Sequence, residues 1–387
     1  MRSSRTLLTT LTIGFACAQV ILFGFSVIAV SHPDLLTRAG GSLVSADGSR
    51  YHVIAEQPGS PYRDFEVEYP PVTLGAIELL NGKTAADTLK EVGILCLFLS
   101  FGVASILLLG WGARECATYL GLGVPLALFV YFRLDLLSVF LAVAAFALLD
   151  RDRQRSAGVA LVLAVFSKVW PIVLVPLFIV RRKWRALRWF LVTGGVAFLA
   201  WVLLSGFDSV VQVATFRHAL GWQNESLVGA IVWVSGTAAH LRGGAFRVGS
   251  APTWTEALLL LSGALVVVSA WVLRRRHPDG ADLDGVAMVA SVGTVLLVSP
   301  ILSPQYVVWL LPWAALAARD RVLVGTTLAL AVLTTLMWFL PGGTAAFKAE
   351  LLVRNAALLV LVGEALWRLR PMMAETEARP VHQPEPC

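Results

Sequence analysis

Apolar stretches separated by clusters of basic residues run along the whole chain, and this alternation predicts a membrane topology. The basic clusters are Arg2/Arg5, Arg114, Arg151/Arg153/Arg155, Arg181/Arg182/Lys183/Arg185/Arg188, Arg274/Arg275/Arg276, Arg319/Arg321 and Arg368/Arg370. Basic residues near the ends of membrane-spanning segments favour the cytoplasmic side. If every cluster is cytoplasmic, each intervening stretch must leave the cytoplasm and return to it. The turns between paired crossings would then all face the outside.

Six out-and-back pairs fit between these clusters, which predicts about twelve membrane segments with both termini in the cytoplasm. The expected pairs are 7–30 with 91–111, 117–132 with 134–149, the two halves of 156–180, 189–206 with 254–273, 285–300 with 306–318, and 322–340 with 351–367. Shorter apolar stretches lie in the two long outer segments. We expect 72–80 to form an interfacial helix started by two prolines, and 227–239 to be re-entrant or interfacial.

The composition agrees with a membrane protein. Apolar residues make up 57% of the 387 positions and charged residues only 14%, whereas a soluble domain has about 25% charged residues. We therefore expect an all-α, multi-pass helical bundle in the plasma membrane, with one domain over 1–370 and a disordered cytoplasmic tail over 371–387. The excess of basic over acidic residues indicates membrane orientation and no nucleic-acid partner.

The shortest expected hairpin predicts where a functional site lies. Each half of 156–180 has about 12 residues around Lys168, fewer than the ~20 needed to cross a full hydrocarbon core. Charge and irregular backbone at such depth survive only beside protein or water. The pattern therefore predicts a cavity that opens on the outer face. Lys168 would either extend its amine to the interface or bind an anionic head group.

The first long outer segment, 32–90, is rich in groups that can transfer protons or bind hydroxyls. Asp47 and Tyr51 come first, and Asp64, Glu66 and Glu68 follow at alternate positions. In an extended run these last three carboxylates would point the same way. They would act as acid–base or binding groups, or they would simply form a solvated acidic loop.

Further candidates lie at the other outer turns. Arg133 and Asp135 either bind substrate or pair with each other and cap helix ends, and the stretch 207–227 is either a sugar-binding loop or an ordinary surface loop. Gln305 needs partners for its amide in an otherwise apolar hairpin. The remaining candidates in these turns are Arg217, Trp222, Asn224 and Tyr306.

No phosphate-binding glycine loop, metal-ligand motif or nucleophile motif is present, and no cytoplasmic stretch is long enough for a nucleotide-sugar domain. A transferase of this kind would have to take its donor from the membrane. The alternative is a transporter or flippase for lipid-linked sugars. Such proteins commonly contain inverted repeats and place polar residues near the bilayer midplane, whereas here the polar residues gather on one side.

The ordered motifs of the outer segments resemble those of glycosyltransferase family 87 over residues 1–370. They are Asp47-x-x-x-Tyr51, Tyr69-Pro70-Pro71, Gln223-Asn224-Glu225-Ser226-Leu227, and Ser299-Pro300-Ile301 with Trp309. This family consists of membrane enzymes of the GT-C fold and includes mycobacterial mannosyltransferases that act on phosphatidylinositol mannosides.

The resemblance implies an inverting hexosyltransferase that moves a sugar, commonly mannose, from a polyprenyl phosphate to a lipid or glycan acceptor. The lipid-linked donor is a co-substrate, and no other cofactor is implied. An aspartate of the first outer loop is the family's general base. Asp47 fits that position by its spacing to Tyr51, and Asp64 is the second choice.

The other candidates then receive roles in the same reaction. Lys168, with Arg133 or Arg217, would stabilise the leaving phosphate. Sugar and acceptor would be oriented by Tyr51, Glu68, Asp135, Trp222, Asn224, Gln305 and Tyr306. Two departures from the family pattern concern the substrate: Glu225 stands where the family has Gln, and Gln305-Tyr306 stand where it has a histidine pair.

Overall fold

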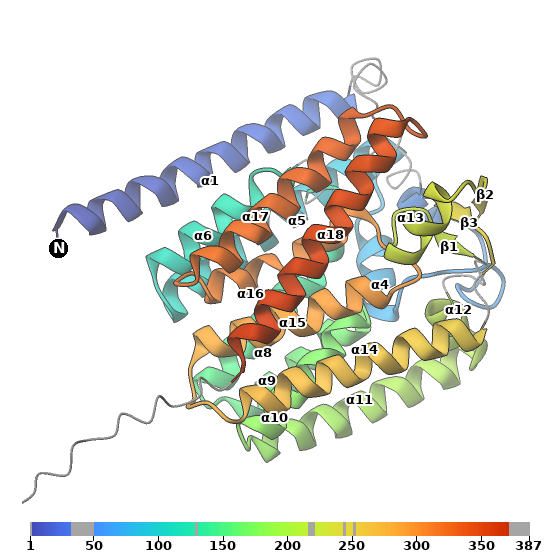
Figure 1. The fold of residues 1–387 in the computed structure, drawn as a ribbon. Coiled ribbons are helices and arrows are strands. Elements are labelled where there is room, and N and C mark those ends of the chain that lie inside the picture. The colour runs from blue at the N-terminus through green and yellow to red at the C-terminus, as the bar shows by residue number, and fades with distance from the viewer. Residues whose placement is uncertain are drawn as a thin grey trace, which may run out of the picture.

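The computed structural model describes residues 2–31, 50–127, 131–215, 221–242, 245–250 and 253–370. It is a mostly helical bundle with one small sheet (Figure 1). The elements are α1 (Arg2–Ser31), α4 (Pro71–Leu79), α5 (Ala85–Gly110), α6 (Ala113–Gly123), α8 (Asp135–Asp150), α9 (Gln154–Ser167), η1 (Trp170–Leu174), α10 (Val175–Val180), α11 (Trp184–Ser205), α12 (Asp208–Ala214), β1 (Trp222–Gln223), α13 (Leu227–Val234), β2 (Ala239–Arg242), β3 (Ala245–Val248), α14 (Thr253–Arg274), α15 (Ala281–Val298), η2 (Pro304–Trp309), α16 (Leu311–Leu316), α17 (Arg321–Leu336), η3 (Met337–Phe339) and α18 (Ala345–Arg368).

Five helices in the described part of the chain are long and apolar enough to cross a membrane. They contain the segments Thr6–Ile28, Ala85–Gly110, Trp184–Ser205, Trp254–Arg274 and Ala281–Val298. The apolar helices Gln154–Ser167 and Arg321–Leu336 are shorter. This is a multi-pass membrane protein, and several of the expected crossings are too short to span a full hydrocarbon core alone.

Helices occur in the expected stretches, but several boundaries are corrected. α6 ends at Gly123, nine residues before the expected 132, α11 starts at Trp184, five before 189, and α18 starts at Ala345, six before 351. α5 starts six residues before the expected 91, at Ala85. Thr84 caps this helix, because its hydroxyl accepts a hydrogen bond from the Asp87 amide at 3.2 Å, and such caps satisfy an otherwise unpaired donor of the first turn. The expected interfacial helix at 72–80 is present as α4, and Pro71 is its first residue.

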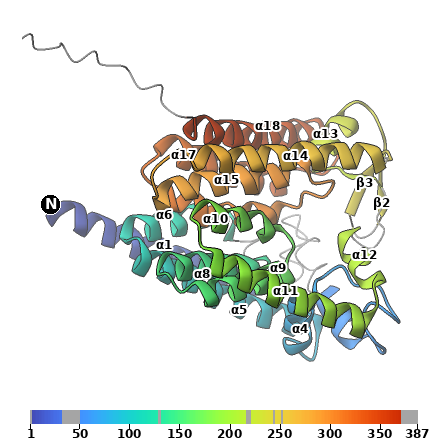
Figure 2. The ribbon, with the colours of Figure 1, turned by 90° about the horizontal axis from the view of Figure 1, so that it is seen from below.

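The basic clusters gather at one end of the bundle, which we call the basic end: residues 150–155, 181–188, 274–284, 316–321 and 368–370. Ion pairs connect these turns. Arg181 bonds both Asp150 and Asp284, Lys183 bonds Asp152 at 2.8 Å, and Arg368 bonds Asp320 at 2.7 Å. Figure 2 shows the N-terminus at this end and α4, α12 and the strands at the other.

The polar segments between the helices meet at the opposite end, here called the loop end: residues 61–80, 131–135, 167–171, 207–215, 221–242, 245–250 and 299–309. Thr73 of α4 donates to the carbonyl of Ser167 at 2.6 Å. Gln212 of α12 donates to the Tyr62 carbonyl at 2.8 Å and accepts from the Val67 amide at 3.2 Å. The first outer segment is therefore tied to two later parts of the chain.

A small antiparallel sheet at the loop end was not expected and corrects the all-α prediction. Its strand order is β1-β3-β2, with Gln223 opposite Arg247 and Leu241 opposite Phe246. The short apolar stretch 227–239 forms α13 and then enters β2. Ser226 caps α13, because its hydroxyl accepts from the Gly229 amide at 3.1 Å.

The prediction that Asp64, Glu66 and Glu68 share one face of an extended run is wrong. Residues 62–64 form a turn, in which Tyr62 has a φ of +68°. Asp64 and Glu66 are exposed, whereas Glu68 is only 9% exposed. The turn breaks the two-residue alternation on which the prediction depended.

Candidate active site

Asp135 and Lys168 form an ion pair where two hairpin tips meet at the loop end. Asp135 is the first residue of α8, and Lys168 follows the last residue of α9 with an extended backbone. The Lys168 Nζ lies 2.7 Å from Asp135 Oδ1, with side-chain exposures of 25% and 6%. The expected alternatives for Lys168, an interfacial amine or a head-group ligand, did not include this partner. Asp135 thus holds the lysine charge in a fixed position.

Three stacked aromatic rings lie beside the Asp135–Lys168 ion pair. Trp309 Nε1 donates to the same Asp135 oxygen at 2.7 Å. The Trp309 ring stacks on Tyr306 at 4.3 Å and on Trp170 at 5.2 Å between centroids. Lys168 Nζ lies 4.4 Å from the Tyr306 ring centre, within the range of cation–π attraction. Three hairpin tips, from α8, α9 and η2, therefore meet at Asp135.

The short helix η2 explains the stack of Tyr306 on Trp309. A 3₁₀ helix has three residues per turn, so side chains at i and i+3 align. Tyr306 and Trp309 are three residues apart within η2. Gln305, one residue earlier, is also buried, at 6% exposure.

Tyr51 brings the first outer segment to the same place. It lies in the helical stretch 50–56 and is 2% exposed. Its hydroxyl accepts from the Leu134 amide at 3.5 Å, next to Asp135, and its ring packs 5.7 Å from that of Tyr69. Burial and then the nearby Asp135 carboxylate raise the pKa of Tyr51 above its ordinary value, so its phenol stays protonated and can donate to a substrate oxygen.

Arg133 and Glu225 extend the site across the loop end. Burial lowers the pKa of Arg133 to about 10, although Asp135, Tyr306 and Glu225 oppose this shift. Burial raises the pKa of Glu225 to about 7, opposed by Arg354 and Arg133. Positive and negative groups thus alternate from Lys168 through Asp135, Arg133 and Glu225 to Arg354, with one net positive charge when all are ionised.

Glu225 makes stability depend on pH. Because the folded-state pKa is raised from 4.5 to about 7, the folded state disfavours the ionised carboxylate. The resulting loss in the free energy of unfolding grows as the pH rises from 4.5 to about 7, and it reaches its full size above that range. We expect Glu225→Gln to raise the thermal unfolding midpoint by a few degrees at pH 8 and to have a smaller effect at pH 5. Midpoints in detergent at both pH values measure this, and a lower midpoint at pH 8 would contradict it.

The segment around Asn224 is fixed mainly through its backbone. The Gln223 amide donates to the Pro300 carbonyl at 2.9 Å, and the Asn224 amide to the Phe246 carbonyl at 3.0 Å. Gly229 must be glycine, since a Cβ there would lie 1.8 Å from the Gln223 carbonyl oxygen. These contacts join the sheet to the turn before η2, beside the aromatic stack.

The chain matches the model of one known protein family over more than half of its length. The model of glycosyltransferase family 87 matches residues 84–300. The chain belongs to glycosyltransferase family 87. No curated protein matches it. The matched range contains Arg133, Asp135, Lys168 and Asn224.

Family membership makes this protein a membrane glycosyltransferase, with a sugar donor and an acceptor as its substrates.

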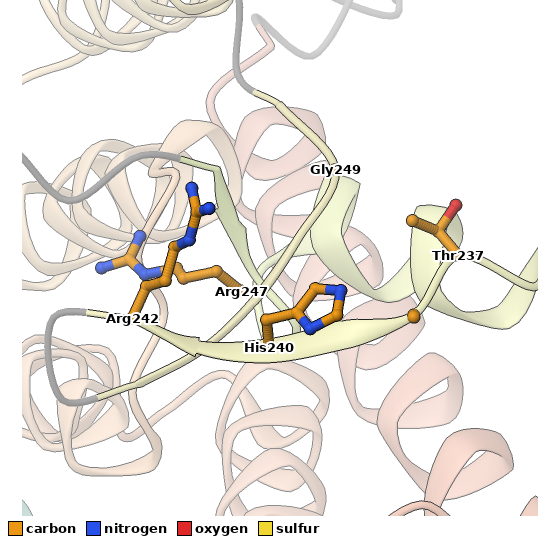
Figure 3. A pocket seen from close by; sticks show the side chains of 6 residues that line it. Thr237, His240, Arg242, Arg247 and Gly249 are labelled. Atoms are coloured by element: carbon orange, nitrogen blue, oxygen red, sulfur yellow. The ribbon is translucent and has the colours of Figure 1, made fainter.

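A second feature of this glycosyltransferase is a cavity of about 310 Å³ on the sheet at the loop end. Figure 3 shows His240, Arg242 and Arg247 around it. The full lining is Thr237, Ala238, His240, Arg242, Arg247 and Gly249. Arg247 is 3% exposed, and its Nη1 donates to the Gly221 carbonyl at 3.1 Å. Two arginines make the lining cationic, and one of them, Arg247, lies on β3, which pairs with the strand that contains Trp222.

The structure brings together some of the expected site residues and separates others. Tyr51, Arg133, Asp135, Lys168 and Tyr306 surround one point. Trp222 and Asn224 are buried in the adjoining sheet segment, at 4% and 6% exposure.

Two of the expected residues, Glu68 and Asp64, have other partners in this family 87 enzyme. Glu68 pairs with Arg50 at 2.7 Å. Asp64 is exposed and accepts from the Ser60 amide at 2.6 Å. Asp47 and Arg217 lie outside the described residues.

Sequence reasoning missed the parts played by Trp170 and Trp309. Trp170 Nε1 donates to the Ser138 hydroxyl at 3.0 Å, and Trp309 Nε1 holds Asp135. Buried tryptophans usually find a partner for the indole N–H. The available signal was a proline in each turn: Pro171 directly follows Trp170, and Pro304 lies five residues before Trp309.

Proposed function

We propose that this glycosyltransferase moves a hexose, mannose in the first instance, from a polyprenyl-phosphate sugar to a lipid or glycan acceptor on the extracytoplasmic side. The observation that supports this most is the meeting of three hairpin tips at Asp135, Lys168 and Tyr306. It places a cation beside aromatic ring faces, a combination that suits a phosphate next to a sugar. Family membership supports the reaction class.

We further propose about twelve membrane segments, one membrane domain over 1–370, both termini in the cytoplasm and a location in the plasma membrane. The gathering of the basic clusters at one end of the bundle supports this orientation, because basic residues are retained on the cytoplasmic side. The loop end would then face outward and would receive a donor whose lipid tail stays in the outer leaflet.

The reaction would be a single displacement with inversion. A carboxylate of the first outer segment, Asp47 or else Asp64, takes the proton of an acceptor hydroxyl. The hydroxyl oxygen forms a new bond to the anomeric carbon while the bond from that carbon to the phosphate oxygen breaks. The bonding electrons leave with the lipid phosphate, so negative charge grows there.

Lys168 is our first choice for stabilising that charge. An ammonium group has three N–H donors, and Asp135 takes one of them at 2.7 Å. The pair fixes the ammonium before the reaction, and preorganised charge in a site of reduced dielectric stabilises a transition state most. Arg133 and Arg217 would assist.

The polar and aromatic groups of the site would orient the sugar and the acceptor. Those that we propose for this role are Tyr51, Glu68, Asp135, Trp222, Asn224, Gln305 and Tyr306.

Replacing Lys168 with glutamine tests its role. We expect kcat/KM for the donor to fall by about 10- to 100-fold, since a hydrogen bond to a charged group contributes about 1.5–3 kcal/mol. The KM for the acceptor should change little. Initial rates with donor and acceptor varied separately measure both quantities. A higher KM for the acceptor with kcat/KM for the donor unchanged would contradict a phosphate-binding role.

The proposed function itself is tested with purified protein in proteoliposomes. Labelled polyprenyl-phosphate mannose and a membrane lipid extract are supplied, and new glycosides are identified by mass spectrometry. A mannosylated product supports the proposal. Movement of the labelled lipid across the bilayer without a new glycosidic bond would indicate the transporter alternative. A product from polyprenyl-phosphate glucose or arabinose alone would replace mannose as the sugar.

A further inference from the structure

A cavity of about 370 Å³ lies at the basic end, far from the loop end, on the first turns of α11. Its lining is Arg185, Arg188, Trp189 and Val192. These residues fall at positions i, i+3, i+4 and i+7, and therefore on one face of the helix. Arginine and tryptophan side by side at a membrane boundary are suited to a charged head group with an apolar tail.

The charge around this cavity is unbalanced. Arg155 of α9 stacks on the Trp189 ring at 4.3 Å and adds a third guanidinium. The nearby carboxylate of Asp152 attracts Arg185, but it already accepts from Lys183 at 2.8 Å and from Gln154 at 2.9 Å. Asp152 thus balances only part of the charge of Arg155, Lys183, Arg185 and Arg188, and an anion bound in the cavity would improve the balance.

The same face of α11 continues as an exposed apolar strip. Val192, Val196, Leu199 and Leu203 are 55%, 65%, 58% and 69% exposed, and they keep the three- and four-residue spacing of the face. Gly195 lies between them, and a Cβ there would meet nothing within 4 Å. The strip is therefore open to a ligand along its length.

The dimensions of this face match one lipid. From Arg188 to Leu199 the helix rises roughly 16 Å at ~1.5 Å per residue, and a single leaflet is half of a ~30 Å hydrocarbon core. A cationic cavity at one end of an apolar strip of this length is complementary to an anionic phospholipid in shape and in charge.

We propose that this cavity binds the phosphate of an anionic glycerophospholipid in the leaflet at the basic end, with an acyl chain along residues 192–203 of α11. Arg185 and Arg188 bind the phosphate oxygens, while Trp189 packs against the glycerol region. The lipid is a structural ligand at the opposite end of the molecule from Asp135 and Lys168, and it takes no part in sugar transfer.

The test compares two double variants in delipidated, detergent-purified protein. Phosphatidylglycerol and phosphatidylcholine are titrated separately, and native mass spectrometry counts bound lipid. Wild-type protein is expected to retain phosphatidylglycerol preferentially. Arg185→Gln with Arg188→Gln should weaken this binding about 30-fold, at roughly 1 kcal/mol for each arginine near an anionic lipid.

Arg275→Gln with Arg276→Gln is the matched control, because both side chains are exposed at the same end and the same charge is removed outside the cavity. It should leave phosphatidylglycerol binding within a few-fold of wild type. A third variant, Gly195→Leu, fills the apolar strip without changing charge and should also weaken binding.

Three results would overturn the proposal. Equal losses in both double variants would mean a general effect of positive charge. Equal retention of phosphatidylglycerol and phosphatidylcholine would remove the anion preference. Displacement of the phospholipid by equimolar polyprenyl phosphate would make this a site for the donor's carrier lipid instead. Because binding is measured without turnover, none of these results depends on the proposed sugar transfer.

Discussion

Replacing Asp47 with asparagine is expected to slow sugar transfer by about 100- to 10,000-fold, the range typical of a lost general base. Asparagine has nearly the same shape as aspartate but cannot take a proton from the acceptor hydroxyl. Binding of donor and acceptor should persist, so the loss should appear in kcat. Single-turnover rates with saturating lipid-linked donor in proteoliposomes measure it.

We favour Asp47 over Asp64 for this role. Asp47 is four residues from Tyr51, a distance of at most roughly 14 Å along the chain, and Tyr51 contacts the Leu134 amide beside Asp135. Asp64 instead points into its own exposed turn, where its carboxylate accepts from the Ser60 amide. We therefore expect Asp64→Asn to retain transfer within a few-fold of wild type.

The paired variants distinguish three outcomes. Loss of transfer only in Asp47→Asn supports the assignment. Loss only in Asp64→Asn would move the base to the second candidate. Full activity in both variants would remove the first outer segment from the chemistry, and the base would have to be sought elsewhere in the loop end.

Replacing Asp284 with asparagine is expected to lower the free energy of unfolding by about 3–5 kcal/mol, the typical cost of breaking a buried ion pair. Arg274 and Asp284 are both 0% exposed, with Arg274 Nε 2.7 Å from Asp284 Oδ1. Arg181 bonds the second carboxylate oxygen. The variant would leave Arg274 without its buried counter-charge and would take away one of the two partners of Arg181.

The control for this variant lies two residues earlier on the same helix. Asp282 pairs with Arg319 at 3.3 Å, but the side chains are 44% and 72% exposed. Exposed pairs contribute about 0–1 kcal/mol, so Asp282→Asn should leave stability nearly unchanged. Unfolding in mixed micelles with increasing sodium dodecyl sulfate compares the two variants. A small loss for Asp284→Asn would mean that its two arginines find other partners.

The sequence predicted the order of the helices well, because basic clusters and apolar length reflect the membrane itself. The turns at Arg133, Lys168 and Gln305 were located from this pattern alone, whereas the side of the membrane on which they lie stays a prediction. The small sheet was missed because β1 has only two residues and its partner strand lies more than twenty residues later. No local alternation of that length can be distinguished from a loop.

The pairing inside the site could not be predicted either. Asp135 is two residues from Arg133 in the chain, and the sequence offered that pair as one of two alternatives. The ion pair of Asp135 with Lys168, across 33 residues, was not among them. Trp309 reaches the same carboxylate across 174 residues. Which charges meet depends on how the hairpins pack together, and helix-level patterns contain no such information.

The Asp284 carboxylate also constrains how the protein is made. Arg181 enters the membrane boundary during synthesis with Asp150 as its neighbour, but Asp284 follows 103 residues later. Until α15 has inserted, the guanidinium has only half of its final counter-charge. The first half of the chain is therefore made before the ion pairs of the basic end are complete, and they become complete only when the second half supplies Asp284.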